Sequence, residues 1–356
     1  MSEILGRSRI PPLPSQPAGV PWPTAAWPEG PLPELSQTGF GEMIAAAFRD
    51  RASERLGETH ALLIAQGGRL AFERYGEGFG PDQTYPSWSM AKSITHALVG
   101  IAVGDGRIDP RAPIDAPEWR RPGDPRAAIT LDQLLRMSSG LRWIEEYVPG
   151  EPSNVIEMLY GPGQADVAAY AASVPLEHAP GSFFYYSSGT TNIVSRALAR
   201  AIGAFGPDFE AFMRQRLFER IGMRSPAPKF DPAGTFIGSS FCFCTARDFA
   251  RFGLLYLRGG VWDGRRILPE GWVDSARTPT WQQAGAEEAD GRYGAHWWLD
   301  RGGEGSFAAL GYDGQCTICV PDLDLVLVRH GATPLDKKEN LRLWVAELVE
   351  CFRRAN

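Results

Sequence analysis

The tetrapeptide Ser89-Met90-Ala91-Lys92 lies at the start of a helix that the sequence pattern predicts over about 87–103. Residues three apart on a helix lie on the same face, so the Lys92 amine can reach the Ser89 hydroxyl and take its proton. A serine activated in this way needs no histidine. The pattern therefore indicates a serine acyl-transfer enzyme, and an ordinary amphipathic helix is the alternative, because the motif is short.

The proposed base places a demand on its surroundings. A free lysine has a pKa of about 10.4, so an effective base near pH 7 needs that pKa lowered by about three units. Burial of the amine, or a second titratable group that exchanges protons with it, would lower it. We therefore expect Lys92 to be buried or to have such a neighbour.

Composition restricts the class of protein. The chain has 356 residues, 44% of them hydrophobic, and a net charge of -6 with both signs interspersed. This indicates a globular protein with one large domain or two closely packed ones, and it predicts neither nucleic-acid nor membrane binding. The first ten residues lead into a proline-rich stretch without an apolar signal segment, so we expect a cytoplasmic protein. We also expect a monomer or homodimer that acts on a small molecule.

The cysteines do not indicate a disulfide framework or a metal site. There are five, an odd number, and a chain of this size needs no covalent cross-links, so we expect them to be reduced. Cys316 and Cys319 form a C-x-x-C pattern within a run that favours a β-strand. Positions three apart on a strand face opposite sides, so we expect no bound metal at these cysteines.

The order of patterns along the chain predicts an α+β fold. Residues 1–38 form a proline-rich arm whose tryptophans indicate packing against the body, with docking to a partner as the alternative. Residues 39–356 form the body, with an antiparallel sheet flanked by helices from about 39–80 and 236–356 and an inserted, mostly helical lobe over about 81–235.

Individual elements follow from the period of the hydrophobic residues. Two β-hairpins are predicted, one over 60–65 and 69–75 and the other over 315–320 and 325–329. The 3.6-residue period predicts helices over 42–56, 131–137, 166–172, 192–202, 209–221 and 339–352.

A third group must carry protons to the leaving atom, and a tyrosine hydroxyl can do this. Tyr186 is the candidate, because it lies in a turn-rich approach to a helix where a polar side chain can be held at the edge of a cleft. A buried core tyrosine is the alternative, and spacing alone does not choose between Tyr185 and Tyr186.

Together these motifs resemble the serine β-lactamase and penicillin-binding-protein superfamily, in its class C-like branch of esterases and 6-aminohexanoate-dimer hydrolases. The resemblance extends over roughly residues 40 to 350. Besides Ser89 and Lys92, it rests on the segments 104–110, 130–140, 180–189, 245–253 and 311–315. It implies a β-lactamase/transpeptidase-like fold.

The resemblance also implies roles for individual residues. Tyr186 matches the tyrosine of the family's Y-x-N motif, which works with the lysine as general base and then general acid, while Ser188 replaces the asparagine. The segment Tyr312-Asp313-Gly314 lies where penicillin-handling relatives have K-T-G. The lysine of that motif is absent, so a true β-lactamase or cell-wall transpeptidase is not expected.

Further site residues follow from the same resemblance. The backbone N–H groups of Ser89 and Gln315 would form the oxyanion hole. The residues expected to contact substrate are Ser188, Tyr312, Asp313, Gly314, Trp298, Glu146 and Tyr147. For Trp298 the alternative is the sheet core, and for Gly311 and Gly314 it is a simple turn. His96 could be a base, but its apolar neighbours favour a structural role.

The sequence thus predicts a serine hydrolase that cleaves an amide or ester of a small molecule through an acyl-enzyme on Ser89, with Lys92 and Tyr186 as general base and acid and without a metal or cofactor. An acyltransferase that uses the same acyl-enzyme is the first alternative. A non-catalytic ligand-binding protein is the second.

Overall fold

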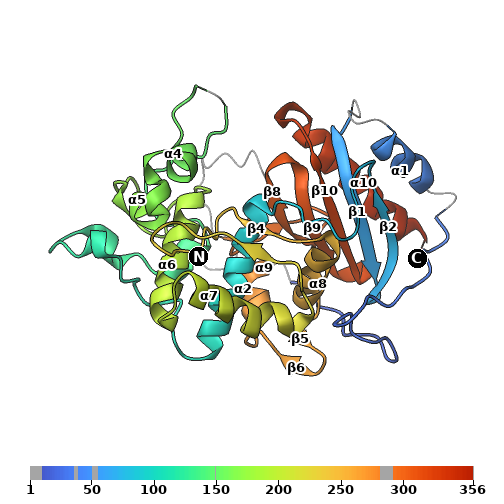
Figure 1. Cartoon of the computed structure of the whole chain (residues 1–356), viewed down its shortest axis with the longest axis horizontal. Helices are drawn as coiled ribbons and strands as arrows, with labels where there is room; N and C mark the ends of the chain where they lie inside the picture. The colour runs from blue at the N-terminus through green and yellow to red at the C-terminus, as the bar shows by residue number, and fades with distance from the viewer. Residues whose placement is uncertain (1–9, 36–38, 50–54, 149, 281–291, 356) are drawn as a thin grey trace, which may run out of the picture.

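A six-stranded antiparallel sheet forms one half of the protein (Figure 1). The computed structural model describes residues 10–35, 39–49, 55–148, 150–280 and 292–355. The strand order is β2-β1-β10-β9-β8-β7. The strands are β1 (Glu58–Gln66), β2 (Arg69–Tyr75), β7 (Trp298–Leu299), β8 (Phe307–Gly311), β9 (Gln315–Val320) and β10 (Leu325–Ala332).

Both predicted hairpins are confirmed, as β1–β2 and β9–β10. The strands from the two ends of the chain meet where β1 pairs with β10, with Leu63 opposite Val328. This long-range pairing joins the N-terminal hairpin to the C-terminal part of the sheet. The predicted α+β class with an antiparallel sheet and a helical lobe is confirmed as well.

Helices cover both faces of this sheet, which explains why its central strands are almost continuously apolar. Helix α8 (Ala246–Leu257) packs on one face, where Leu63 and Val328 point. Helices α1 (Phe40–Phe48) and α10 (Lys338–Ala355) pack on the other, where Leu62 and Leu327 point. Cys316 and Cys319 also point to opposite faces, so the two thiols cannot share a metal ion.

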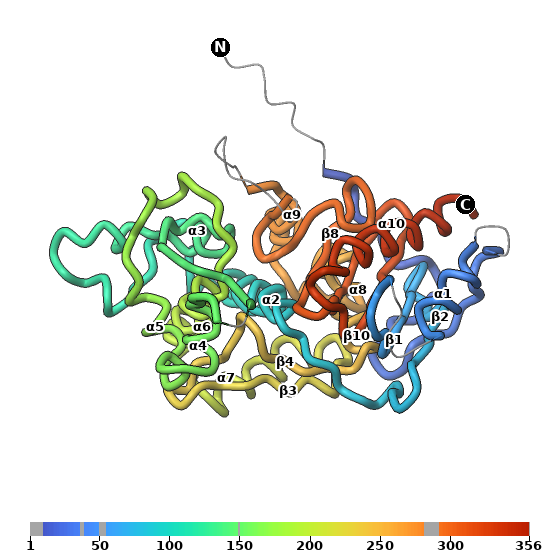
Figure 2. The backbone as a smooth tube through the Cα atoms, turned by 90° about the horizontal axis from the view of Figure 1, so that it is seen from above, coloured from blue at the N-terminus to red at the C-terminus, as the bar shows by residue number. Residues whose placement is uncertain are grey.

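The second half is the helical lobe, and α2 runs between it and the sheet (Figure 2). The described helices of the lobe and of its border with the sheet are α2 (Ala91–Gly104), α3 (Leu131–Leu135), α4 (Asn154–Tyr160), α5 (Val167–Ser173), α6 (Ser188–Ile202), α7 (Pro207–Met213) and α9 (Trp272–Arg277). Short two-stranded ribbons pair β3 (Ala227–Pro228) with β4 (Cys242–Phe243) and β5 (Val261–Trp262) with β6 (Arg265–Arg266).

Two helix boundaries differ from the predicted ones for identifiable reasons. Helix α6 begins at Ser188 and not at Asn192, because the Ser187 hydroxyl accepts a hydrogen bond from the Thr190 N–H and caps the helix four residues earlier. The predicted helix over 209–221 is not continuous. Helix α7 ends at Met213, a π-helical turn follows at Arg214–Phe218, and a 3₁₀ turn closes the segment.

The described part of the proline-rich arm packs against the body. Trp27 is buried and donates its indole N–H to the Arg247 carbonyl at 3.2 Å. Trp22 lies with its ring centroid 5.0 Å from that of Trp262. The arm therefore adds aromatic surface to the core. Within the described segments, no helix is both long and apolar enough to cross a membrane.

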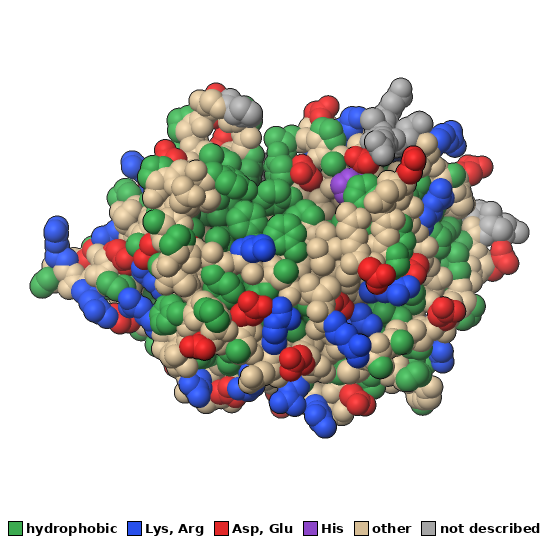
Figure 3. Space-filling model, in the orientation of Figure 1, with side chains coloured by type: hydrophobic (Ala, Val, Ile, Leu, Met, Phe, Trp, Pro, Cys, Tyr) green, Lys and Arg blue, Asp and Glu red, His purple; other side chains and the backbone are tan. Residues whose placement is uncertain are grey.

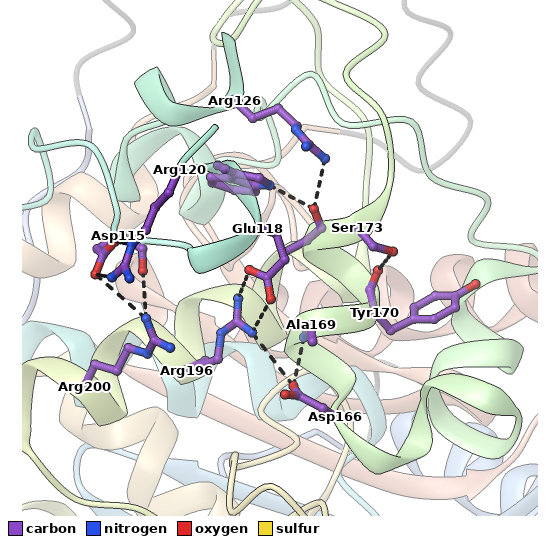
Figure 4. Close-up of polar contacts among 12 residues, drawn as sticks. Asp115, Glu118, Arg120, Arg126, Asp166, Ala169, Tyr170, Ser173, Arg196 and Arg200 are labelled. Carbon is purple, nitrogen blue, oxygen red and sulfur yellow. Dashed lines mark hydrogen bonds and ion pairs between the residues drawn. The ribbon is translucent and has the colours of Figure 1, made fainter. Parts of the chain in front are cut away.

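A cluster of charged side chains links separate segments of the helical lobe through hydrogen bonds and ion pairs (Figure 4). The Arg196 guanidinium of α6 donates to both carboxylate oxygens of Glu118, at 2.9 and 2.6 Å, and lies 3.9 Å from Asp166. Asp166 caps α5 by accepting from the Ala169 N–H. Burial is the largest single effect and raises the pKa of Glu118, but the hydrogen bonds that Glu118 accepts and the charges of Arg196 and Arg200 together leave the pKa below its usual value.

This geometry predicts that Arg196→Met destabilises the lobe. The Arg196 side chain is only 8% exposed, so the variant leaves two partly buried carboxylates without their cation, and we expect a loss of about 2–3 kcal/mol. Chemical denaturation measures this loss. The matched control is Arg111→Met, whose side chain is 89% exposed and which we expect to change stability by less than about 0.5 kcal/mol. Equal stability of the two variants would contradict the prediction.

Candidate active site

Ser89 lies in a tight turn at the start of α2. The 3₁₀ turn Trp88–Met90 leads directly into Ala91. Trp88 has a φ of 42°, a left-handed conformation that is strained for a bulky residue and that clusters at functional sites. The end of β8 lies against this turn, since a Cβ atom on Gly311 would lie 2.4 Å from the Ser87 carbonyl oxygen. Glycine at 311 thus permits a close approach to the segment that carries Ser89.

The Lys92 amine lies at the centre of three hydrogen bonds. Its Nζ atom lies 2.9 Å from Ser89 Oγ, 3.0 Å from Ser188 Oγ and 2.9 Å from the Ser239 carbonyl oxygen. These oxygens belong to the start of α2, the start of α6 and the segment before β4. A single amine therefore connects three parts of the chain, and the predicted contact between Lys92 and Ser89 is present.

Burial lowers the basicity of this amine. Lys92 is 1% exposed, and this burial lowers its pKa to about 8, although the negative charge of Glu145 raises it. At that pKa, roughly one amine in ten is neutral at pH 7, compared with about one in 2,500 for a free lysine. The surroundings thus supply most of the shift that the sequence argument requires.

Glu145 connects the loop after α3 to Ser188. One carboxylate oxygen accepts from the Ser188 hydroxyl at 2.5 Å and from the Tyr147 hydroxyl at 2.6 Å. The other accepts from the Trp143 indole N–H at 2.6 Å and from the Ser188 backbone N–H at 2.8 Å. Four donors therefore hold the Glu145 carboxylate next to the residue that contacts Lys92.

The resemblance pointed to the loop of Glu145, Glu146 and Tyr147, and Glu146 was the glutamate expected to contact substrate. In the structure one Glu146 carboxylate oxygen accepts from the Tyr147 and Val148 backbone N–H groups, so this side chain folds onto its own loop. Adjacent side chains of an extended loop point in different directions, and spacing alone does not show which one faces Lys92. The sequence feature that could have identified Glu145 is its position two residues before Tyr147.

Tyr186 lies beside the lysine. The Lys92 amine is 4.9 Å from the centroid of the Tyr186 ring. Trp298 stacks on the same ring, with centroids 5.3 Å apart and an interplanar angle of 30°, and is itself 8% exposed. Tyr185 points elsewhere and is 45% exposed. The structure thus brings Tyr186, and not its neighbour, against Lys92.

The segment Tyr312–Gly314 forms a tight turn between β8 and β9. Asp313 and Gly314 have φ values of 59° and 79°, and glycine meets the second requirement without strain. Arg329 of β10 supports the turn by donating to the Gly314 carbonyl at 3.0 Å and to the Asp313 carbonyl at 3.3 Å. The sequence analysis did not identify Arg329 as a support of this turn, although it is a charged residue within the mostly apolar strand β10.

Gln315 follows this turn and is buried. Its side chain bridges the end of β10, where Nε2 donates to the Gly331 carbonyl at 2.6 Å and Oε1 lies 3.0 Å from His330 Nδ1. Its backbone N–H points back to the Tyr312 carbonyl. An oxyanion that binds this N–H would therefore have to displace the Tyr312 carbonyl oxygen or share the hydrogen with it.

Aromatic side chains surround the segment that carries Ser89. The Trp88 ring lies 5.8 Å from the rings of both Tyr312 and Phe241, and the Tyr147 ring lies 5.1 Å from that of Tyr312. Figure 3 shows hydrophobic side chains gathered on this face, between the helical lobe and the sheet. Sequence reasoning included Tyr147 and Tyr312 in the site but missed Trp88 and Phe241.

The two histidines near α2 have structural surroundings. His296 Nδ1 lies 2.9 Å from the Lys92 carbonyl oxygen, and burial, with a further contribution from the Lys92 charge, lowers its pKa to about 3. His96 is buried, its Nδ1 lies 2.8 Å from the Tyr256 hydroxyl, and burial lowers its pKa well below the usual value. Both rings are therefore neutral near pH 7.

The fold and this serine–lysine–tyrosine geometry define a class of serine hydrolases. The family model described as Beta-lactamase matches residues 44–347, and the chain belongs to this family.

Among curated proteins, the chain is similar to the 6-aminohexanoate-dimer hydrolase of Paenarthrobacter ureafaciens, with 27% identity over 297 residues that cover 79% of this chain and 75% of the relative.

Solved structures share the fold. A Bacillus anthracis protein, provisionally named 6-aminohexanoate-dimer hydrolase, superposes with a TM-score of 0.71 at 23% identity, covering 89% of this chain and 85% of its own. A family VIII carboxylesterase superposes with a TM-score of 0.66 at 15% identity, covering 92% and 99%. At these identities, the two structures establish the arrangement of elements and nothing about substrate.

Proposed function

We propose that this protein hydrolyses an amide or ester of a small molecule through an acyl-enzyme on Ser89. The observation that carries the proposal is the 2.9 Å contact between the Ser89 hydroxyl and a buried amine with a pKa of about 8. A serine next to a base of lowered pKa is the arrangement that nucleophilic catalysis requires. The similarity to a 6-aminohexanoate-dimer hydrolase supports an amide substrate.

The proposed reaction begins with proton transfer. Neutral Lys92 takes the Ser89 proton while Ser89 Oγ attacks the substrate carbonyl, and the backbone N–H groups of Ser89 and Gln315 stabilise the oxyanion. The proton then passes through Tyr186 to the departing amine or alcohol. Water enters, loses a proton to the same pair and releases the acid from Ser89. The Ser89 proton leaves with the amine or alcohol, and a proton from the water replaces it on Ser89, so the enzyme is restored and water is the only co-reactant.

The proposed setting is the cytoplasm. All five cysteines are buried free thiols, as expected where thiols remain reduced. Cell fractionation with an antibody to the protein would test this location, and recovery of the protein outside the cytoplasm would contradict it.

The first test is Ser89→Ala with p-nitrophenyl acetate and butyrate as substrates. The wild type should show a burst of p-nitrophenol and a mass increase of one acyl group on Ser89, and the variant should show neither, with turnover reduced by at least about a thousandfold. Stopped-flow absorbance and intact-protein mass spectrometry measure these results. Equal turnover by the two proteins, with no adduct, would reject the acyl-enzyme and favour the non-catalytic alternative.

The second test is pH dependence. Only the neutral amine accepts a proton, so kcat/KM should rise with pH through an apparent pKa of about 8, which is the pKa of Lys92 in the folded protein. Initial rates between about pH 6 and 9.5, corrected for the Ser89→Ala background, give the profile. Lys92→Arg keeps a positive charge that never becomes neutral, so its activity should be lost across this range. A flat wild-type profile would argue against Lys92 as the base.

The third test is Tyr186→Phe, which keeps the ring on Trp298 and removes only the hydroxyl. An amine leaving group needs a proton more than a nitrophenolate does, so amide hydrolysis should fall about a hundredfold and nitrophenyl ester hydrolysis by much less. Paired kinetics on p-nitroanilide and p-nitrophenyl butyrates measure the difference. Tyr185→Phe is the control and should change neither rate. An equal fall for both substrates would remove Tyr186 as the general acid.

A further inference from the structure

The hydrogen bonds around Lys92 raise a question of direction. A neutral lysine has two hydrogens and one lone pair, and the lone pair must face Ser89 if Lys92 is to accept its proton. The Ser239 carbonyl can only accept, so it takes one of the two hydrogens. The Ser188 hydroxyl, however, can either accept from Lys92 or donate to it. In the second case it would occupy the lone pair and block the base.

We propose that Glu145 is a positioning residue that fixes this direction. Its carboxylate takes the only hydrogen of the Ser188 hydroxyl, so Ser188 presents only an acceptor lone pair to Lys92 at 3.0 Å. Both hydrogens of the neutral amine are then held by Ser188 and Ser239, and its lone pair is left for Ser89. This inference rests on the proposed function and explains how a serine at 188 can serve where an amide side chain is expected.

The proton balance of the first step agrees with this role. When the Ser89 hydrogen moves to Lys92, the new ammonium has three hydrogens and three oxygen acceptors, namely Ser89 Oγ, Ser188 Oγ and the Ser239 carbonyl. No side chain has to turn during the transfer. The Glu145 carboxylate already accepts four hydrogen bonds, so it supports the base and is not itself placed to take a proton from water.

Replacement of Glu145 by glutamine should reverse the Ser188 hydroxyl. Two of the four donors to Glu145 are the Trp143 indole and the Ser188 backbone N–H groups, which cannot accept. The amide nitrogen of the Glu145→Gln variant must therefore face the two hydroxyls, which can turn and accept from it. The Ser188 hydrogen then points to Lys92. The substitution changes one oxygen to nitrogen and keeps the size of the side chain. It therefore tests the direction of the Ser188 hydrogen bond more than the packing around residue 145.

Glu145 has a second, separable effect through its charge. The carboxylate raises the pKa of Lys92 against the larger lowering by burial. Removal of the charge should therefore lower that pKa further and move the midpoint of the kcat/KM profile to lower pH. The direction of the Ser188 hydrogen bond should therefore set the plateau, which is the kcat/KM reached at high pH. The charge of Glu145 should set the midpoint, which is the pH of half-maximal kcat/KM.

The experiment measures kcat/KM for p-nitrophenyl butyrate against pH in the wild type, Glu145→Gln, Ser188→Asn and the double variant. Glu145→Gln should lower the plateau at least about tenfold and shift the midpoint to lower pH. In the double variant the plateau should recover to within about threefold of Ser188→Asn alone, because an amide oxygen accepts with no hydrogen to direct, while the midpoint stays low. The control is Glu151→Gln, which makes the same change of charge at an exposed position of the same loop and which should change neither quantity.

A plateau and midpoint in Glu145→Gln equal to those of the wild type would overturn the inference, as would a double variant that stays at the plateau of Glu145→Gln. Mass spectrometry of the Ser89 adduct separates this failure from failure of the proposed function, since the wild-type adduct tests only the latter. Thermal unfolding checks that each variant is folded. If Glu145→Gln is not folded, Glu145→Ala replaces it and should also lower the plateau and the midpoint, because the Ser188 hydroxyl loses its acceptor and can turn its hydrogen to Lys92.

Discussion

The site depends on a lysine held away from water between the sheet and the helical lobe. Lys92 contacts oxygens from the start of α2, the start of α6 and the segment before β4, so its position is defined only when all three segments are in place. An amine is suited to this position because its donors are arranged tetrahedrally and can satisfy acceptors from separate directions. Folding of these three segments against one another therefore also places the amine that the proposed mechanism uses as its base.

This arrangement balances two opposing electrostatic effects. Burial of an ammonium group is unfavourable, and here it lowers the pKa of Lys92 to about 8. The Glu145 carboxylate lies one hydroxyl away and opposes the shift. Without burial the amine would stay protonated, and without a nearby carboxylate the buried charge would be less stable when it forms. The Ser188 hydroxyl between them keeps the carboxylate from forming a direct ion pair that would fix Lys92 in its charged state.

Local sequence patterns predicted the helices and strands, but they did not predict the contacts between residues that are distant in the sequence. Both hairpins and the helix after Ser89 were predicted, because apolar alternation and the spacing of Ser89 and Lys92 are local properties. The turn-rich approach to a helix made Tyr186 a candidate, and the resemblance of ordered motifs separated it from Tyr185. The structure places Tyr186 against Lys92, and its catalytic role stays a prediction. Glu145 and Glu146 are chemically identical neighbours, and only the loop conformation sends the first to Ser188 and the second to its own backbone. Periodicity does not encode that conformation.

The division between the polar and aromatic parts of the site has a consequence for specificity. The polar residues are linked by hydrogen bonds and leave little freedom for change, because each lost partner exposes a buried polar group; they are Ser89, Lys92, Ser188 and Glu145. The surrounding rings of Trp88, Phe241 and Tyr312 contact one another through their faces and edges, and stand outside that network. Substitutions among these rings can therefore change the space beside Ser89 while the hydrogen bonds of Lys92 stay in place. In the proposed mechanism, such changes would alter the size of substrate that the site accepts without altering the base.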